Sequence, residues 1–151
     1  APSVVPEPPI TRRAPLSGGF ASSPASPRVM PAPAPTPAPL RAIAPHAGGG
    51  PWETGGTYDA EGHLQCAQAP VAAMIFIGLA DTNVDPSEGR KSIAHWSWAN
   101  GCAATMKAYA PSPCAAFDGC KKPVVKCEIP NVGHRIWNDG PKATWDFFAS
   151  F

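Results

Sequence analysis

The sequence lacks any cluster of basic residues and any long apolar run. Its 12 Lys and Arg residues are balanced by 11 acidic ones, for a net charge of +1, so the composition predicts no nucleic-acid partner and no membrane partner. No stretch approaches the roughly 18 consecutive apolar residues of a transmembrane helix. The chain also does not begin with a basic segment followed by an apolar one. For a secreted protein, we expect the signal segment to lie upstream or to have been removed.

Zinc-knuckle spacing is missing as well. Four of the 5 cysteines stand within 26 residues, with 11, 5 and 6 residues between them and no C-x-x-C pair. This spacing disfavours a zinc site and favours a local disulfide framework. The disulfide candidates are Cys102, Cys114, Cys120 and Cys127, and their three possible pairings stay open, with Cys66 left over. Disulfides predict an oxidising, extracellular location.

Proline is concentrated in the first third of the chain. Residues 1–45 hold 13 of the 21 prolines, and five of these alternate with Ala or Thr from Pro31 to Pro39. Each proline removes a backbone donor and restricts the residue before it, so we expect residues 1–50 to be an irregular, polyproline-like segment. Residues 51–151 are then the folded part, because a chain of this length supports one modest core.

The second part of the chain alternates strand and helix patterns. The predicted elements are a strand over 71–77, a helix over 86–100, a disulfide-held loop over 102–122, a strand over 123–129 and a helix from about residue 139. The first strand is a continuous apolar run, which is typical of a strand covered on both faces. Asp85 supplies the N-cap of the predicted helix, and Pro86 suits its first position. This order predicts α/β architecture with parallel strands.

An acid and an imidazole follow the two predicted strands. Asp81 comes just after the first strand, and His134 comes shortly after the second. Because parallel strands end at the same edge of a sheet, we expect these two side chains to lie close together. A carboxylate that orients a histidine is the combination used in nucleophilic acyl transfer, where the histidine takes a proton from a serine. We therefore predict Asp81 as the acid and His134 as the base.

Four motifs surround these residues in a fixed order. They are Ile-Gly-Leu-Ala-Asp-Thr-Asn-Val at 77–84, the cysteine region at 100–128, Gly-His at 133–134 and Thr-Trp-Asp-Phe-Phe at 144–148. In this order they resemble the acid loop, cysteine region, histidine loop and closing helix of secreted feruloyl esterases and polyhydroxybutyrate depolymerases. The resemblance covers most of residues 70–151. It implies part of an α/β-hydrolase, a parallel sheet with flanking helices, preceded here by the proline-rich irregular segment, with no cofactor and no metal.

The resemblance also implies a nucleophile. Pro-Leu-Ser-Gly-Gly at 15–19 stands where these enzymes have their Gly-x-Ser-x-Gly elbow, which makes Ser17 the nucleophile-equivalent residue. The stretch 41–48 is similar to the strand and loop that follow the elbow. Pro15 replaces the first glycine of the motif, and the proline-rich run 24–39 replaces the helix after the serine. We accordingly expect an incomplete hydrolase domain without its early strands.

The implied function is hydrolysis of a carboxylic ester by Ser17, Asp81 and His134. The implied substrate is a feruloylated polysaccharide or a polyhydroxyalkanoate-type polyester, and the oligomeric state stays open. One alternative is a non-catalytic, disulfide-stabilised extracellular binding module on a proline-rich linker. A second alternative is a truncated product without activity.

Aromatic and histidine residues outside these motifs receive simpler interpretations. Trp137, just after His134, is the tryptophan that we place near a substrate. Trp96 and Trp145 lie on predicted helix faces and are expected in the core. The remaining histidines, His46, His63 and His95, are expected to be structural or exposed.

Overall fold

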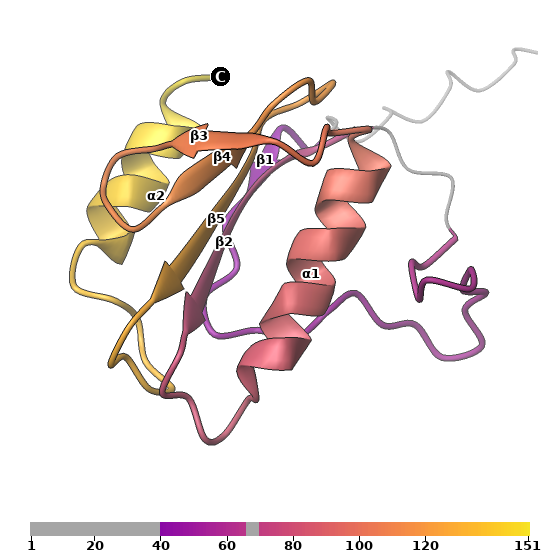
Figure 1. The fold of residues 1–151 in the computed structure, drawn as a ribbon, viewed down its shortest axis with the longest axis horizontal. Coiled ribbons are helices and arrows are strands. Elements are labelled where there is room, and N and C mark those ends of the chain that lie inside the picture. The colour runs from indigo at the N-terminus through magenta and orange to yellow at the C-terminus, as the bar shows by residue number, and fades with distance from the viewer. Residues whose placement is uncertain (1–39, 66–69) are drawn as a thin grey trace, which may run out of the picture. The chain divides into compact units, whose positions relative to one another are not determined.

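The computed structural model describes residues 40–65 and 70–151. They form a five-stranded mixed sheet in the order β1-β2-β5-β4-β3, with two helices (Figure 1). The elements are β1 (Ala42–Ile43), β2 (Ala72–Gly78), α1 (Pro86–Ala99), β3 (Met106–Ala108), β4 (Ala115–Phe117), β5 (Val124–Ile129) and α2 (Gly140–Phe148). Both predicted strands and both predicted helices occur where the sequence places them. Neither helix of this described part is long and apolar enough to cross a bilayer.

The prediction of a partial α/β-hydrolase with a parallel sheet is wrong. Strands β1, β2 and β5 run parallel, but β4 and β3 are antiparallel, so the sheet is mixed. Only two short helices, of 14 and 9 residues, accompany it in the described ranges. The physical reason is the segment 102–122, expected as a loop, which forms the β3–β4 hairpin. That hairpin pairs with the edge of β5 that a further parallel strand would otherwise occupy.

Two disulfides settle the pairing that the sequence leaves open. They join Cys102 to Cys120 and Cys114 to Cys127. The register of β4 on β5 pairs Ala115 with Lys126, so the bridge from Cys114 to Cys127 continues the same register. These disulfides rule out the zinc alternative for the four cysteines and are compatible with an extracellular protein. Cys66 lies outside the described residues.

Strand β2 is buried along its whole length, as its continuous apolar run predicts. Its alternate side chains enter two separate cores, one under each helix, and the helices lie on opposite faces of the sheet (Figure 1). Toward α1, Ile75 and Ile77 pack with Ile93, while toward α2, Met74 and Phe76 share a core with Phe147. Burying each of these large side chains stabilises the fold by about 1.5–3 kcal/mol. The sheet is thus the middle layer of three.

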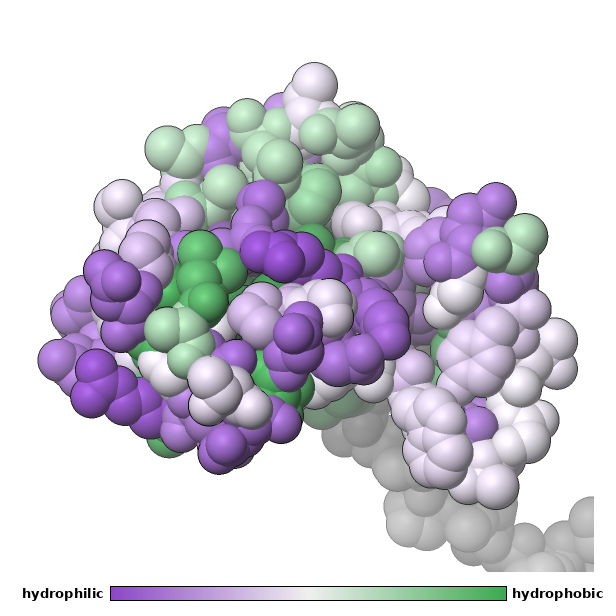
Figure 2. Space-filling view, turned by 60° about the horizontal axis from the view of Figure 1, so that its bottom comes forward, coloured by the Kyte–Doolittle hydropathy of each residue, from purple (hydrophilic) through white to green (hydrophobic). Residues whose placement is uncertain are grey.

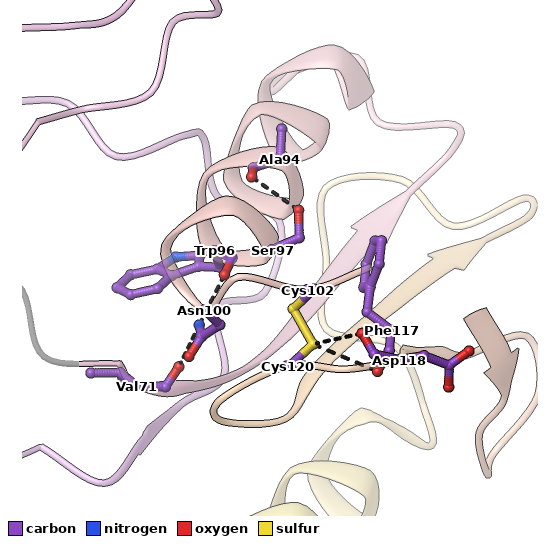
Figure 3. The surroundings of a disulfide bond; sticks show 9 residues. All are labelled: Val71, Ala94, Trp96, Ser97, Asn100, Cys102, Phe117, Asp118 and Cys120. Carbon is purple, nitrogen blue, oxygen red and sulfur yellow. Dashed lines mark hydrogen bonds between the residues drawn. A yellow bond between two sulfur atoms is a disulfide. The ribbon is translucent and has the colours of Figure 1, made fainter. Parts of the chain in front are cut away.

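The ends of α1 follow from its sequence. The Asp85 carboxylate accepts a hydrogen bond from the backbone N–H of Ser87, which confirms the predicted N-cap. At the other end, the Asn100 amide is fully buried and donates to the carbonyls of Trp96 and Val71, at 2.8 and 3.0 Å (Figure 3). Asn100 therefore ties the end of α1 to the start of β2, beside the Cys102–Cys120 disulfide.

The aromatic residues of α2 do not all face the core. Trp145, expected in the core, is 73% exposed, so that prediction is wrong. The buried face is formed instead by Ala143 and Phe147, which stand one turn apart. Because apolar residues occur on both faces of this short helix, their spacing does not identify the buried face. Trp96 of α1 is partly buried and packs against the core under that helix.

We predict that Asn100→Ala lowers the free energy of unfolding by about 1–3 kcal/mol, because it removes a fully buried side chain and leaves the Val71 carbonyl without this donor. Urea denaturation followed by circular dichroism measures this change. Ser97→Ala is the matched control, since its exposed hydroxyl bonds only to the Ala94 carbonyl and its loss should change stability by less than about 0.5 kcal/mol. Equal effects of the two substitutions would contradict the tethering role of Asn100.

Candidate active site

Asp81 and His134 lie at the carboxyl ends of two adjacent parallel strands. Strands β2 and β5 are paired as far as Gly78 and Ile129, and the loops after them carry the two side chains. The Nδ1 atom of His134 lies 3.0 Å from Oδ2 of Asp81, although 53 residues separate them in the chain. The structure thus brings together the two residues that the sequence predicts as neighbours. Their catalytic roles remain a prediction.

Backbone contacts hold the two loops against each other. The N–H of Leu79 donates to the Ile129 carbonyl, and the N–H of Ala80 donates to the Val132 carbonyl at 2.9 Å. A Cβ atom on Gly78 would lie 2.4 Å from the Val132 carbonyl oxygen, much closer than real contacts allow. Glycine at position 78 therefore permits the approach that places His134 beside Asp81.

A left-handed residue turns the chain after β5. Asn131 has a φ of 59°, a conformation that Asn tolerates better than most other non-glycine residues. This turn directs Val132 back toward the end of β2, and the histidine follows two residues later. The sequence Pro-Asn after the strand is the signal for it.

The Asp81 carboxylate is buried and fully engaged. Its side chain is 2% exposed, and Oδ1 accepts hydrogen bonds from the backbone N–H groups of Asn83 and Val84, at 2.9 and 3.0 Å. Burial by itself would raise the pKa of Asp81. The hydrogen bonds from Val84, His134 and Asn83 outweigh burial, so the pKa lies below its ordinary value. Asp81 is therefore a fixed negative charge at neutral pH.

The His134 imidazole is oriented at one nitrogen and open at the other. An ionised carboxylate can only accept, so Nδ1 carries the proton and donates it to Asp81. The side chain is 44% exposed, and no group in the described ranges hydrogen-bonds to Nε2. In the neutral ring Nε2 is then a proton acceptor on a side chain that is accessible to solvent. A neutral imidazole held in this tautomer can act as a general base.

Trp137 packs on the core under α2. Its ring is partly buried, and its centroid lies 6.4 Å from that of Phe76 in β2. A contact with substrate remains a prediction for this residue.

His46, expected to be structural or exposed, packs between β2 and α2. It follows β1 and pairs with Phe76 of β2, on whose ring its imidazole stacks at 4.1 Å. Its Nε2 lies 3.0 Å from the Thr144 hydroxyl of α2, and burial lowers the pKa of His46. His46 therefore contacts both β2 and α2 near the carboxyl ends of the parallel strands. A histidine within three residues of the end of a short parallel strand is the sequence signal for this position.

A second Asp–His pair occurs away from this edge. His63 Nδ1 lies 3.0 Å from Oδ2 of Asp59, only four residues earlier, and the liganding atoms of Asp59, Glu61 and His63 lie within 4.8 Å of one another. These three could hold a metal ion by their chemistry. Asp59 already accepts hydrogen bonds from the backbone of Glu61 and His63, which makes it the cap of a local turn.

The predicted nucleophile Ser17 lies outside the described residues. Neither a known protein family nor a curated protein matches the chain.

We predict that Gly78→Ala lowers the free energy of unfolding by about 1–3 kcal/mol, because the added methyl group forces the two loops apart. Thermal or urea unfolding measures the loss. Gly133→Ala is the matched control on the same contact, since its Cβ would meet the Ala80 carbonyl at an ordinary 3.5 Å. A Gly78→Ala protein as stable as Gly133→Ala would show that the loops do not need this close approach.

The lowered pKa of Asp81 predicts a pH dependence of stability. As pH falls below about 4, the unfolded chain takes up a proton at this residue before the folded chain does. The stability contributed by ionised Asp81 is therefore present at pH 6 and is lost as pH falls through the folded pKa. Urea midpoints of the wild type and of Asp81→Asn should converge over this range. Asp139→Asn is the control because its carboxylate makes no capping bond, and its difference from wild type should stay nearly constant.

Proposed function

We propose that the protein is a carboxylic ester hydrolase in which Asp81 and His134 are the acid and the base. The observation that carries the proposal is the hydrogen bond from His134 to the buried Asp81, which leaves Nε2 of His134 open to a substrate or nucleophile. The two residues come from adjacent strand ends, where sites of parallel sheets are found. The order of serine, acid and histidine along the chain also agrees with this class of enzyme.

In the proposed mechanism the Ser17 hydroxyl attacks the ester carbonyl. His134 Nε2 takes the hydroxyl proton as the C–O bond forms, and then gives it to the leaving alcohol as the acyl–serine ester remains. A water molecule next attacks this ester, His134 takes its proton, and the proton returns to the serine oxygen as the acid leaves. Asp81 keeps the imidazole in the required tautomer and stabilises the imidazolium formed in each half.

The proposed substrates are feruloylated polysaccharides or polyhydroxyalkanoate-type polyesters. This choice rests on the similarity of the acid, cysteine and histidine segments to feruloyl esterases and polyhydroxybutyrate depolymerases. The disulfides are in keeping with secretion, because disulfides form and persist in oxidising compartments.

A non-catalytic extracellular binding module is the second candidate function. One observation favours it: within residues 40–65 and 70–151, no hydroxyl or thiol hydrogen-bonds to His134. In such a module the Asp81–His134 pair would serve only to join the two loops.

A serine-directed fluorophosphonate probe and a nitrophenyl ester test the proposal. We expect labelling to be lost in Ser17→Ala, and we expect ester hydrolysis to fall by about 10⁶-fold in Ser17→Ala and in His134→Ala, as in other enzymes of this type. Asp81→Asn should also lower the rate, because the wrong tautomer is then favoured. Ser22→Ala, from the same segment of the chain, is the control and should keep full activity.

The outcome that contradicts the proposal is folded wild-type protein that neither reacts with the probe nor hydrolyses the ester. Circular dichroism establishes folding in that case. Labelling that survives Ser17→Ala but is lost in His134→Ala would retain the esterase and reject Ser17 as its nucleophile.

A further inference from the structure

A cavity of about 340 Å³ opens on the outer side of α1, and its lining includes neither Asp81 nor His134. It lies between the helix and the segment 50–63 that follows β1. Its lining includes Trp52, Tyr58, Glu61, His63, Glu88 and Lys91. In Figure 2 this segment forms the lobe at the right of the view, mostly pale and therefore of intermediate hydropathy. The volume falls in the range of about 300–1,000 Å³ typical of pockets that hold small ligands.

The walls of the cavity are fixed by contacts that need no ligand. Asp59 caps a turn by accepting hydrogen bonds from the backbone of Glu61 and His63, at 3.2 and 2.7 Å. The His63 ring is held between the Asp59 carboxylate and the Trp98 ring of α1, on which it stacks at 4.8 Å. Because these contacts order the wall before a ligand binds, less conformational entropy is lost on binding.

Close backbone packing joins the segment to the helix. A Cβ atom on Gly50 would lie 2.8 Å from the Cβ of Lys91, and one on Gly56 would lie 2.7 Å from the Leu64 side chain. The two glycines allow the segment to lie against α1 and against itself. The cavity is therefore part of the packed structure.

The chemistry of the lining favours a neutral, hydroxyl-rich ligand. Trp52 is 77% exposed at the cavity and offers an aromatic face on which the apolar face of a sugar ring can stack. The exposed Glu61 carboxylate can accept hydrogen bonds from hydroxyl groups. Glu88 and Lys91 pair with each other across one wall, which leaves Glu61 as the net charge and disfavours an anionic ligand.

We propose that this cavity binds a neutral oligosaccharide. The site is separate from the proposed ester-hydrolysing site and does not depend on it. It would hold a glycan chain on the α1 side of the molecule, whether or not an ester is cleaved elsewhere.

Isothermal titration of the full chain with xylohexaose tests the proposal, with cellohexaose as a second probe. Neither sugar carries an ester, and the His134→Ala protein serves as host, so that the result is independent of the proposed hydrolysis. We expect saturable binding of at least one of the two sugars. Trp52→Ala should weaken binding roughly tenfold, because it removes the stacking surface. Glu61→Gln should weaken it by a few-fold, because it replaces a charged acceptor.

Trp145→Ala is the matched control. Trp145 is nearly as exposed as Trp52, at 73%, but lies on α2, across the sheet from α1. Its loss should change the affinity less than twofold. Equal weakening by the two tryptophan variants would reveal general adsorption to aromatic surfaces and overturn the proposal. Absence of binding of both sugars by the folded protein would also overturn it.

Discussion

The parallel pairing of β2 with β5 is the interaction on which the rest of the structure depends. It buries β2, whose seven residues are all buried, inside the sheet, and each face of that strand is covered by a helix. It also places the carboxyl ends of the two strands side by side, where Gly78 allows the loops that follow them to touch. The Asp81–His134 hydrogen bond is a consequence of this pairing, because each residue follows its strand within a few positions.

Most of this centre could be predicted from local patterns. A continuous apolar run identifies β2, an N-cap with a following proline identifies the start of α1, and the placing of Asp81 and His134 after strands predicts their proximity. The β3–β4 hairpin could not be predicted in this way, since its strands have three residues each and carry no alternating apolar pattern. Its position is fixed by pairing with β5 and by a disulfide, both of which are non-local. The prediction of a parallel hydrolase sheet is wrong at β4 and β3, because the motifs lie in loops and carry no information on which strand pairs with the edge of β5.

The two Asp–His pairs have similar local geometry but differ in how much of the fold each one requires. Asp59 and His63 are four residues apart, and one turn of the chain is enough to join them. Asp81 and His134 are joined only after a strand, a helix, a hairpin and a second strand have formed. In both pairs one oxygen of the carboxylate accepts backbone N–H groups and the other contacts Nδ1. The first pair forms part of the wall of the cavity beside α1, whereas the second depends on the whole fold.

The order of the two disulfides along the chain has a further effect. The closed loops, Cys102 to Cys120 and Cys114 to Cys127, overlap, so that residues 114–120 belong to both. A single cleavage of the backbone anywhere between Cys102 and Cys127 leaves the two pieces covalently joined. One bridge packs against the core under α1 and the other belongs to the core under α2, so both layers stay attached to the hairpin after such a cut. A protease that cuts once in this exposed edge hairpin therefore releases no fragment.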